Sequence, residues 1–426
     1  MLEIKTIHER TNDVKDALKK RGYDEKEVKI IDQLIELDNN RKATQTELDS
    51  NLAQINKISK SIGELFKSGK VQEANAMKDK VSDLKSSADP LEQQLKQITE
   101  DIQNILFKLP NMPHKKVPEG LSEDDNVVVK EWDKPLPKLI ENAKPHWELA
   151  EVYNIIDFKL GVKITGAGFP LYRGKGAIFQ RALINFFLDE ARAEGYEEII
   201  PPLLINEDSA IGTGSLPDKE AQMYHMEKDN LYLIPTAEIP VTNIVRNEIL
   251  KESDFPVKFC AYTPCFRREA GSYGSDVKGL NRVHQFDKIE IVQIEHPDRS
   301  HETLDKMVAY VEGLLNKLEL PYRILRLCGG DLTFASALTY DFEVYSAAQE
   351  KWLEVSSVSN FETFQSNRMK CRYKDKNGKT QLVHTLNGSA LALARIVAAL
   401  LENNQTENGV KVPEVLRSYT RFDVID

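Results

Sequence analysis

Two short segments place charged and aromatic side chains where a β-strand would turn them to one face. They are "FRREAG" at residues 266–271 and "HQFDKIE" at residues 284–290. Strand alternation predicts that Arg267 and Glu269 share a face, and the second segment adds Phe286 and Glu290. Arginine can bind a phosphate through two parallel hydrogen bonds, glutamate can accept from an amino group, and a phenyl ring can stack on a base. Together the segments predict part of a nucleotide site.

A second group of polar residues lies in "WLEVSSVSN" at residues 352–360. Alternation predicts that Glu354 and Ser356 share one strand face, with Ser357 close by. A carboxylate and hydroxyl groups beside phosphates are ligands that suit Mg²⁺. In "GSALALARIVAALLENNQ" at residues 388–405, which predicts a helix, Arg395 interrupts an apolar stripe. Each pattern alone is more often structural, and Arg395 alone fits a snorkelling arginine. Together they describe a nucleotide site with two arginines and a metal.

Several other catalytic patterns do not occur in the sequence. It contains neither a GxxxxGK[ST] phosphate loop nor a GxSxG nucleophile elbow, and no Cys and His residues have zinc-site spacing. The four cysteines are scattered along the chain. Their spacing predicts isolated buried thiols in a reducing compartment, and we expect no structural zinc.

Composition limits the kind of protein further. The 426 residues are enough for two or three domains, and the formal net charge of −10 argues against broad, nonspecific binding to nucleic acid. The start of the chain lacks the apolar core of a signal peptide, and no apolar run approaches the roughly 18 residues that span a bilayer. We therefore expect a cytoplasmic protein without a membrane partner.

The chemistry-bearing segments follow a long helical region, residues 1–110, which predicts an antiparallel coiled-coil hairpin. Its second helix has apolar residues at alternating steps of four and three, the pattern of a coiled-coil seam. They are Met77, Val81, Leu84, Ala88, Leu91, Leu95, Ile98, Ile102 and Ile105. The first helix has a matching seam at Leu48, Leu52, Ile55, Ile62 and Phe66, with Ser59 in the slot between the two isoleucines. "SGK" at residues 68–70 separates the two seams and predicts a turn, and Pro90 predicts a kink.

The tip of this hairpin is locally basic. Six lysines (Lys57, Lys60, Lys67, Lys70, Lys78 and Lys80) outnumber Glu64, Glu73 and Asp79. A solvated helix face is the simpler reading of such a run. However, a long arm buries little beyond its own seam, and a basic patch can bind phosphates, so the arm is expected to reach a partner.

The rest of the chain divides into a linker and a larger domain. Residues 111–138 are rich in proline and charge, which predicts a linker. In residues 139–426, short strand-like segments alternate irregularly with helices. This order favours an α+β domain built on an antiparallel sheet flanked by helices.

The ordered motifs resemble those of the class II aminoacyl-tRNA synthetases. "GYEEIIPP" is similar to their motif 1, whose proline lies at a dimer interface, "FRREAG" through "HQFDKIE" looks like motif 2, and "LNGSALALARIVAALLENNQ" looks like motif 3. "GTGSLPDKEAQMY", "IPTAEIPVTN", "LEVSSVSNFETFQSNR" and "VPEVLRSY" follow in the pattern of the seryl-tRNA synthetase family, bacterial type. The helical hairpin matches that family's tRNA-binding arm.

The resemblance implies a role for each matching residue. Arg267 and Arg395 are the catalytic pair. The ATP-binding set is Arg267, Arg268, Glu269, Val283, Phe286, Glu354, Val355, Ser356, Ser357 and Arg395. The serine-binding set is Thr236, Ala237, Glu238, Arg267, Glu290, Asn387 and Ser389. Glu354 and Ser357 are the implied ligands of Mg²⁺.

The same resemblance implies the reaction and the partners. L-serine reacts with the substrate ATP to give seryl-adenylate, and serine then passes to tRNA(Ser) on a homodimeric enzyme; it stays open whether tRNA(Sec) is charged too. The sequence departs from the family pattern at Arg268, Ser275, Val358 and Ala390. The family often has an arginine at the position of Ser275, so the resemblance does not imply a contact from this side chain to ATP or to the tRNA end.

Three rival readings differ in testable features. A class II relative that charges a carrier protein lacks the long arm. A threonyl-type enzyme reads its amino acid with zinc held by Cys and His, which the cysteines of this chain do not offer. A coiled-coil scaffold with a degenerate synthetase domain would have no reason to retain Arg267, Glu269, Glu354 and Arg395 as buried charges.

Overall fold

The chain forms two compact units. The computed structural model describes residues 1–218, 221–269 and 278–426. One unit consists of residues 2–19 and 23–110, and the other of Met1, residues 20–22 and residues 111–426.

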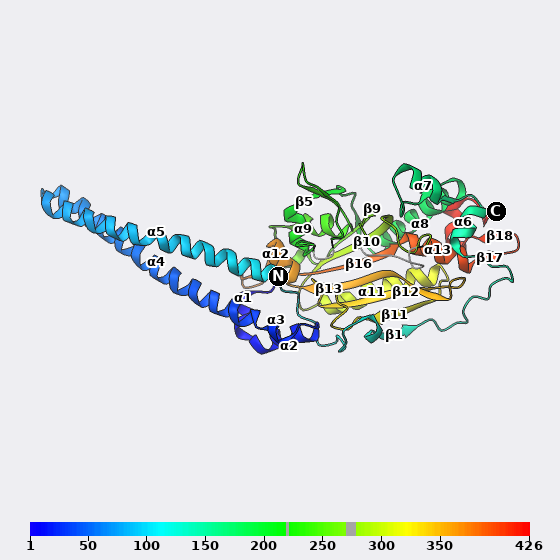
Figure 1. Cartoon of the computed structure of the whole chain (residues 1–426), viewed down its shortest axis with the longest axis horizontal. Coiled ribbons are helices and arrows are strands. Elements are labelled where there is room, and N and C mark those ends of the chain that lie inside the picture. The colour runs from blue at the N-terminus through cyan, green and yellow to red at the C-terminus, as the bar shows by residue number, and fades with distance from the viewer. Residues whose placement is uncertain (219–220, 270–277) are drawn as a thin grey trace. The chain divides into compact units, whose positions relative to one another are not determined.

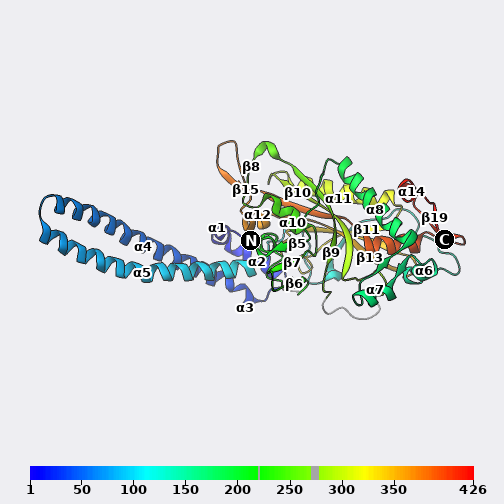
Figure 2. The same ribbon diagram turned by 90° about the horizontal axis from the view of Figure 1, so that it is seen from above.

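Two long helices make up most of the first unit. They are α4 (Ile30–Lys67) and α5 (Val71–Lys108), and the shorter α1 (Ile4–Glu9), α2 (Thr11–Lys20) and α3 (Glu25–Val28) precede them. The long helices run side by side in opposite directions (Figures 1 and 2). Gly69 makes the turn between them with a φ of +75°, which glycine adopts without strain. The predicted antiparallel hairpin is confirmed, and α5 continues through Pro90.

The seam of the hairpin follows the prediction in α5 and departs from it in α4. Every predicted seam residue of α5 is buried or half-buried, whereas most of the residues between them are exposed. In α4, Leu52 and Phe66 are 38% and 40% exposed, and Ile58 and Leu65 are the more buried residues instead. The heptad phase therefore passes through Ile58 rather than Ser59, so no polar residue occupies the seam there.

An eight-stranded sheet forms the centre of the second unit. Its strand order is β1-β11-β12-β13-β16-β10-β9-β4. The bounds are β1 Val127–Glu131, β11 Tyr322–Arg326, β12 Leu338–Ser346, β13 Lys351–Glu362, β16 His384–Ala392, β10 Gln285–Glu295, β9 Val257–Phe266 and β4 Glu197–Glu198. Neighbouring strands are antiparallel except for β4 and β9. The predicted α+β class with an antiparallel sheet is confirmed.

Strand β10 shows how this sheet separates a core from a site. Ile289 and Ile291 point into a large apolar core that includes residues of α8 (Gly174–Ala193), α11 (Ser300–Lys317) and α13 (Leu393–Asn403). Lys288 and Glu290 alternate with them and therefore face the opposite side. The helices seal one face of the sheet, and polar residues can gather on the other.

Smaller elements surround the sheet. The small sheets are β2–β3 (Ile156–Asp157, Leu171–Tyr172), β5–β7–β6 (Leu204–Asn206, Leu231–Leu233, His225–Met226), β15–β14–β8 (Thr380–Leu382, Arg372–Lys374, Ile249–Lys251) and β17–β18–β19 (Gln405–Thr406, Gly409–Lys411, Val424–Ile425). The remaining helices are α6 (His146–Val152), α7 (Phe158–Ile164), α9 (Glu207–Thr213), α10 (Glu238–Thr242), α12 (Phe364–Met369) and α14 (Glu414–Thr420). Among the described residues, no helix is both long and apolar enough to cross a membrane.

The structure differs from two sequence-based expectations in this unit. Within the segment expected to be a linker, Val127–Glu131 form β1 and pair with β11 at the sheet edge. Three consecutive valines favour a strand there, despite the proline and charge around them. The segment expected to be a helix from Gly388 is strand β16 as far as Ala392, and the helix begins at Leu393.

Candidate active site

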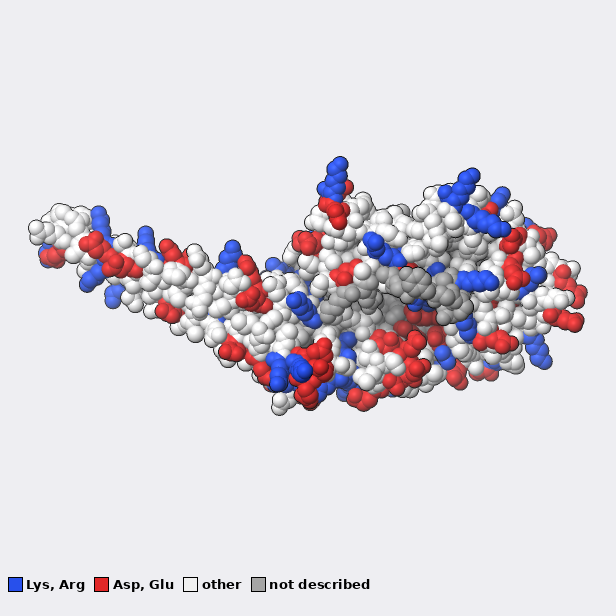
Figure 3. Space-filling model, viewed as in Figure 1, with Lys and Arg blue, Asp and Glu red and all other residues white. Residues whose placement is uncertain are grey.

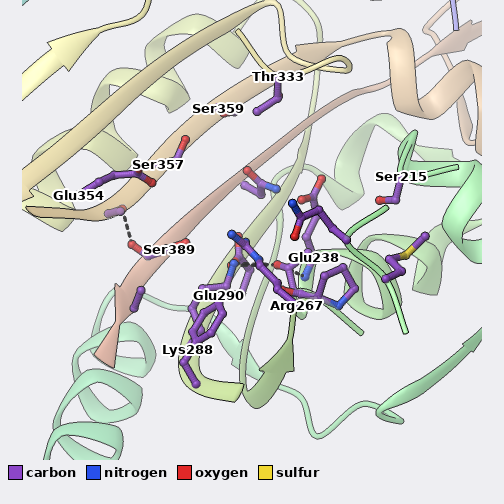
Figure 4. A pocket seen from close by; sticks show the side chains of 18 of the residues that line it. Ser215, Glu238, Arg267, Lys288, Glu290, Thr333, Glu354, Ser357, Ser359 and Ser389 are labelled. Atoms are coloured by element: carbon purple, nitrogen blue, oxygen red, sulfur yellow. Dashed lines mark hydrogen bonds and ion pairs between the residues drawn. The ribbon is translucent and has the colours of Figure 1, made fainter. Parts of the chain in front are cut away.

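A cavity of about 660 Å³ lies on the polar face of the central sheet. Side chains from β10, β13, β16 and α13 form part of its wall, and the segment before α10 closes another part. Figure 4 shows Glu354, Ser357 and Ser389 on one side and Arg267, Glu238, Lys288 and Glu290 on the other. Such a volume is typical of a site for a small molecule.

Fourteen of the predicted site residues line this one cavity. They are Thr236, Glu238, Arg267, Glu269, Val283, Phe286, Glu290, Glu354, Val355, Ser356, Ser357, Asn387, Ser389 and Arg395. Two predicted residues are not part of its lining. The guanidinium of Arg268 lies 5.4 Å from the ring centre of Tyr224, and Ala237 is fully buried in a separate apolar core.

A buried ion pair forms the floor of the cavity. Lys288 Nζ lies 2.6 Å from Glu290 Oε2, and the two side chains are 7% and 2% exposed. The same ammonium group donates a hydrogen bond of 2.8 Å to Thr236 Oγ1. Charges this deeply buried need a partner, and Lys288 supplies one for Glu290.

Glu238 is a second carboxyl group near this pair. Gln365 Nε2 donates to Glu238 Oε1 at 2.7 Å. Burial, followed by the nearby negative charge of Glu290, raises the pKa of Glu238 to about 7. Two carboxyl groups facing one lysine leave the floor suited to a further positive charge, because an added cation would favour the ionised form of Glu238.

Arg267 reaches the cavity from the end of β9. The strand ends at Phe266, so the predicted alternation of Arg267 and Glu269 along one strand is wrong, and Glu269 instead has a φ of +47°. The guanidinium of Arg267 lies 5.3 Å from the ring centre of Phe286, and its Nε donates to Pro235 O at 3.4 Å. Glu269 Oε2 lies 3.4 Å from a terminal guanidinium nitrogen of Arg282. Both predicted side chains still reach the cavity.

A β-bulge brings Glu354 and Ser357 together. The register between β12 and β13 shifts between Phe342 and Glu343, opposite Val355. Because the shift resets the alternation, Glu354 and Ser357 both line the cavity although they are three residues apart. Ser356 donates to the backbone oxygen of Ser389 at 2.6 Å and so fastens β13 to β16.

The oxygen atoms at this bulge fit a hard cation. Asp341 is the cross-strand partner of Ser357, and its Oδ1 is buried without a hydrogen-bond partner among the described residues. Burial and the charge of Glu354 raise the pKa of Asp341. Clustered carboxylate and hydroxyl oxygens are the donor set that Mg²⁺ prefers, and a cation would relieve their repulsion.

Arg395 enters the cavity from the first turn of α13. Its Nε donates to Asn281 O and one terminal nitrogen donates to Glu354 O, both at 2.8 Å. The alternative interpretation was a snorkelling arginine that extends into solvent. It does not account for the two hydrogen bonds from Arg395 to backbone carbonyl groups. They direct the guanidinium along the cavity wall.

Comparison with known proteins decides the family. Residues 1–113 match the seryl-tRNA synthetase N-terminal domain, and residues 222–404 match the tRNA synthetase class II core domain (G, H, P, S and T). A serine–tRNA ligase of Salinibacter ruber is 49% identical over 99% of this chain and 98% of its own length. The chain belongs to the seryl-tRNA synthetase family.

Solved structures of seryl-tRNA synthetases support the same assignment. The ATP complex of the Pyrococcus horikoshii enzyme matches with a TM-score of 0.93, 35% identity and coverage of 100% of this chain and 99% of that one. The AMP complex of the Naegleria fowleri cytoplasmic enzyme matches with a TM-score of 0.88, 26% identity and coverage of 100% and 99%. The predicted family and enzyme class, a serine–tRNA ligase, are confirmed. The comparisons favour this assignment over the three rival interpretations.

Several residues that line the cavity were not predicted from the sequence. Lys288 lies on the same strand face as Phe286 and Glu290, so strand alternation could have predicted that it lines the cavity. Asn281 and Gln222 also line the cavity, but no sequence pattern around them indicates it. The loop position at which the sequence departs from the family pattern, Ser275, lies within residues 270–277, outside the described residues.

Proposed function

We propose that the cavity is the site at which this chain joins L-serine to the α-phosphate of ATP before transfer to tRNA(Ser). The observation that carries the proposal is that Arg267 and Arg395 line the same cavity as the Glu238 and Glu290 carboxyl groups. Two arginines suit a polyphosphate, and two carboxyl groups suit an ammonium group. One cavity can thus hold both substrates.

The floor is assigned to serine. Glu290 and Glu238 receive the ammonium group, because Lys288 offsets only one of the two carboxyl charges and the bound cation favours the ionised form of Glu238. Thr236, Asn387 and Ser389, each at most 9% exposed, supply hydroxyl and amide groups for the remaining atoms of serine. A wall that hydrogen-bonds the serine hydroxyl discriminates against alanine by about four to five orders of magnitude, since its polar groups would stay unpaired. Threonine is excluded by size.

The wall beside Phe286 is assigned to ATP. The adenine stacks on Phe286 next to Val283, and Arg395 covers its other face and extends to the γ-phosphate. Arg267 lies over Phe286 in this structure and leaves the ring to meet the α-phosphate and the serine carboxylate. Glu269 binds the adenosine side, and Arg268 contributes to this wall only if it leaves Tyr224.

Glu354 and Ser357 would hold Mg²⁺ beside the phosphates, flanked by Val355 and Ser356. Bound there, the ion supplies positive charge that offsets the negative charge of the triphosphate. The fit rests on the oxygen atoms of Glu354 and Ser357, which line the cavity, and on Asp341 Oδ1, which has no hydrogen-bond partner in the part of the chain that the structure describes.

The reaction needs no nucleophile from the protein. An oxygen of the serine carboxylate attacks the α-phosphorus, and the bond from that phosphorus to the bridging oxygen of pyrophosphate breaks. A terminal ribose hydroxyl of the tRNA then attacks the serine carbonyl carbon, and AMP leaves. Arg267 and Arg395 contribute by holding the reacting groups in line and by neutralising charge.

The helical hairpin is proposed as the tRNA-binding arm. All six lysines near its tip are exposed. Acidic and basic side chains alternate along the face of the arm seen in Figure 3, so contact with tRNA phosphates depends on local clusters rather than on net charge. The chain would act in the cytoplasm, where tRNA is charged.

We also propose a homodimer formed through the motif 1 segment. Ile200 is 90% exposed, and Leu203 and Leu204 next to Pro201 and Pro202 are 37% and 40% exposed. Light scattering should give twice the chain mass of 48.4 kDa. Ile200→Asp should lower the mass towards the monomer, whereas Ile249→Asp, at a residue 54% exposed on a small sheet, should not. A monomeric unaltered chain would exclude the dimer.

ATP–pyrophosphate exchange tests the proposed function. Exchange should depend on serine and should be far slower with alanine or threonine. A response to alanine or threonine but not to serine would overturn the assignment. A second assay with tRNA(Ser) and tRNA(Sec) transcripts measures which tRNA accepts the serine.

A further inference from the structure

A buried network outside the cavity holds the wall on which Arg395 rests. His146, the first residue of α6, and Glu402, in the last turn of α13, are both fully buried. His146 Nδ1 donates to Glu402 Oε1 at 2.7 Å, and the backbone N–H of His146 donates to the same oxygen at 3.0 Å. Neither residue lines the cavity.

The other ring nitrogen of His146 holds a segment that does line the cavity. The backbone N–H of Leu280 donates to His146 Nε2 at 2.8 Å. An Nε2 that accepts this bond carries no proton, so the ring is neutral with its proton on Nδ1, directed to Glu402. Gly279 lies against the ring, since a Cβ there would come within 2.2 Å of Nε2. The ring thus fixes both the position and the direction of residues 279–280.

The next residue carries the link to Arg395. Asn281 O accepts from Arg395 Nε at 2.8 Å, and Asn281 Nδ2 donates to Gln349 Oε1 at 2.7 Å. Gln349 Nε2 in turn donates to Glu402 Oε1 at 3.0 Å. The contacts form a closed circuit, because Glu402 and Arg395 belong to the same helix.

From this circuit we infer that His146 and Glu402 are positioning residues for Arg395 in the activation step. Glu402 fixes the tautomer of His146, His146 holds the Leu280 N–H, and the adjacent Asn281 carbonyl then sets the direction of the Arg395 guanidinium. Burial alone would raise the pKa of Glu402, but hydrogen bonds from His146 and Ser346 lower it, so the carboxylate stays charged and able to orient the ring. The inference rests on the proposed ATP-binding role of Arg395.

His146→Phe tests the link, because phenylalanine keeps most of the ring volume and removes both ring hydrogen bonds. KM for ATP in pyrophosphate exchange should rise about tenfold, while KM for serine changes less than about threefold. His146→Gln, whose Oε1 can still accept from Leu280, should recover part of the ATP effect. Equal rises in both KM values would show a general structural role and overturn the inference.

A double-mutant cycle separates positioning from stability. In an Arg395→Ala background, adding His146→Phe should cause little further loss of ATP affinity, measured by calorimetry without serine. In a Glu290→Gln background, His146→Phe should lower the ATP affinity by the same factor as it does in the unaltered chain. If His146→Phe lowers the ATP affinity by this same factor in both backgrounds, the inference is contradicted.

Two further changes cover the case in which His146→Phe does not fold. Glu402→Gln removes the charge that orients the ring, and Gly279→Ala pushes on the ring itself. Each should weaken ATP binding and leave serine binding nearly unchanged; unchanged ATP binding in both variants would also contradict the inference. If the unaltered chain shows no serine-dependent exchange, the proposed function fails instead, so the two failures are distinguishable.

Discussion

The ammonium group of Lys288 lies 2.6 Å from the Glu290 carboxylate at the floor of the cavity. Removing one member of such a pair leaves the other as an isolated buried charge. The stability of the site and the proposed binding of the serine ammonium group therefore both involve Glu290.

Lys288→Met should lower the free energy of unfolding by about 3 kcal/mol, because Glu290 would remain buried without its partner. Urea unfolding measures the change. The matched control is the double variant Lys288→Met/Glu290→Gln, in which no unpaired charge remains and most of the stability should return. A single variant as stable as the unaltered chain would show that water already satisfies Glu290.

Glu238 should make the stability of the ligand-free chain depend on pH. Its pKa rises from 4.5 to about 7 on folding, chiefly through burial, so the folded state retains a proton that the unfolded state has lost between these values. The contribution of Glu238 to stability is therefore largest below about pH 4.5 and falls as the pH rises towards 7. Glu238→Gln, which cannot ionise, should gain stability relative to the unaltered chain across this window.

Thermal unfolding at pH 5, 6, 7 and 8 measures this difference. The Tm of Glu238→Gln minus that of the unaltered chain should increase from pH 5 to pH 7 and then level off. A difference that is constant with pH would mean that Glu238 titrates normally in the folded chain.

Arg395→Ala should reduce serine-dependent exchange by at least about a hundredfold, because positive charge is lost where negative charge develops. Its effect on Tm should be small, since the Asn281 and Glu354 carbonyl groups it leaves can be hydrated from the cavity. Arg395→Lys is the matched control and should not restore activity, because lysine cannot donate to two separated carbonyl groups with a planar fork. Near-normal exchange by the alanine variant would remove Arg395 from the ATP site.

Shortening the helical arm should separate the two half-reactions. Deleting residues 52–65 and 73–86 removes whole heptads from both helices and shortens the arm by about 21 Å, with the turn at Gly69 retained. Exchange of pyrophosphate should be unchanged, and aminoacylation of tRNA(Ser) should fall by about a hundredfold or more. Full aminoacylation by the shortened chain would refute the role of the arm.

The predictable parts of the molecule are those in which a local pattern carries the information. The four-three spacing from Met77 to Ile105 predicted the seam of α5, because a heptad is a local property of one helix. The same reasoning placed Ser59 in the α4 seam, where Ile58 lies instead. A heptad seam through Ser59 and one through Ile58 both fit the sequence of α4, and only packing against α5 distinguishes them.

Other features depend on contacts that no local pattern contains. The bulge opposite Val355 brings Glu354 and Ser357 to one cavity, and strand alternation alone pairs Glu354 with Ser356. The contact between His146 and the Leu280 N–H joins residues 134 positions apart. Resemblance to a family carried over the residues proposed to bind substrates, whereas the contacts of His146 behind the cavity appeared only in three dimensions.

A crystal structure with a seryl-adenylate analogue, in which a sulfamate replaces the phosphate, tests the central claim most directly. The ammonium group should lie within hydrogen-bond distance of Glu290, and the adenine should lie between Phe286 and Arg395. Binding elsewhere, for instance in the second cavity of about 460 Å³ lined by Tyr172 and Asp287, would contradict the account.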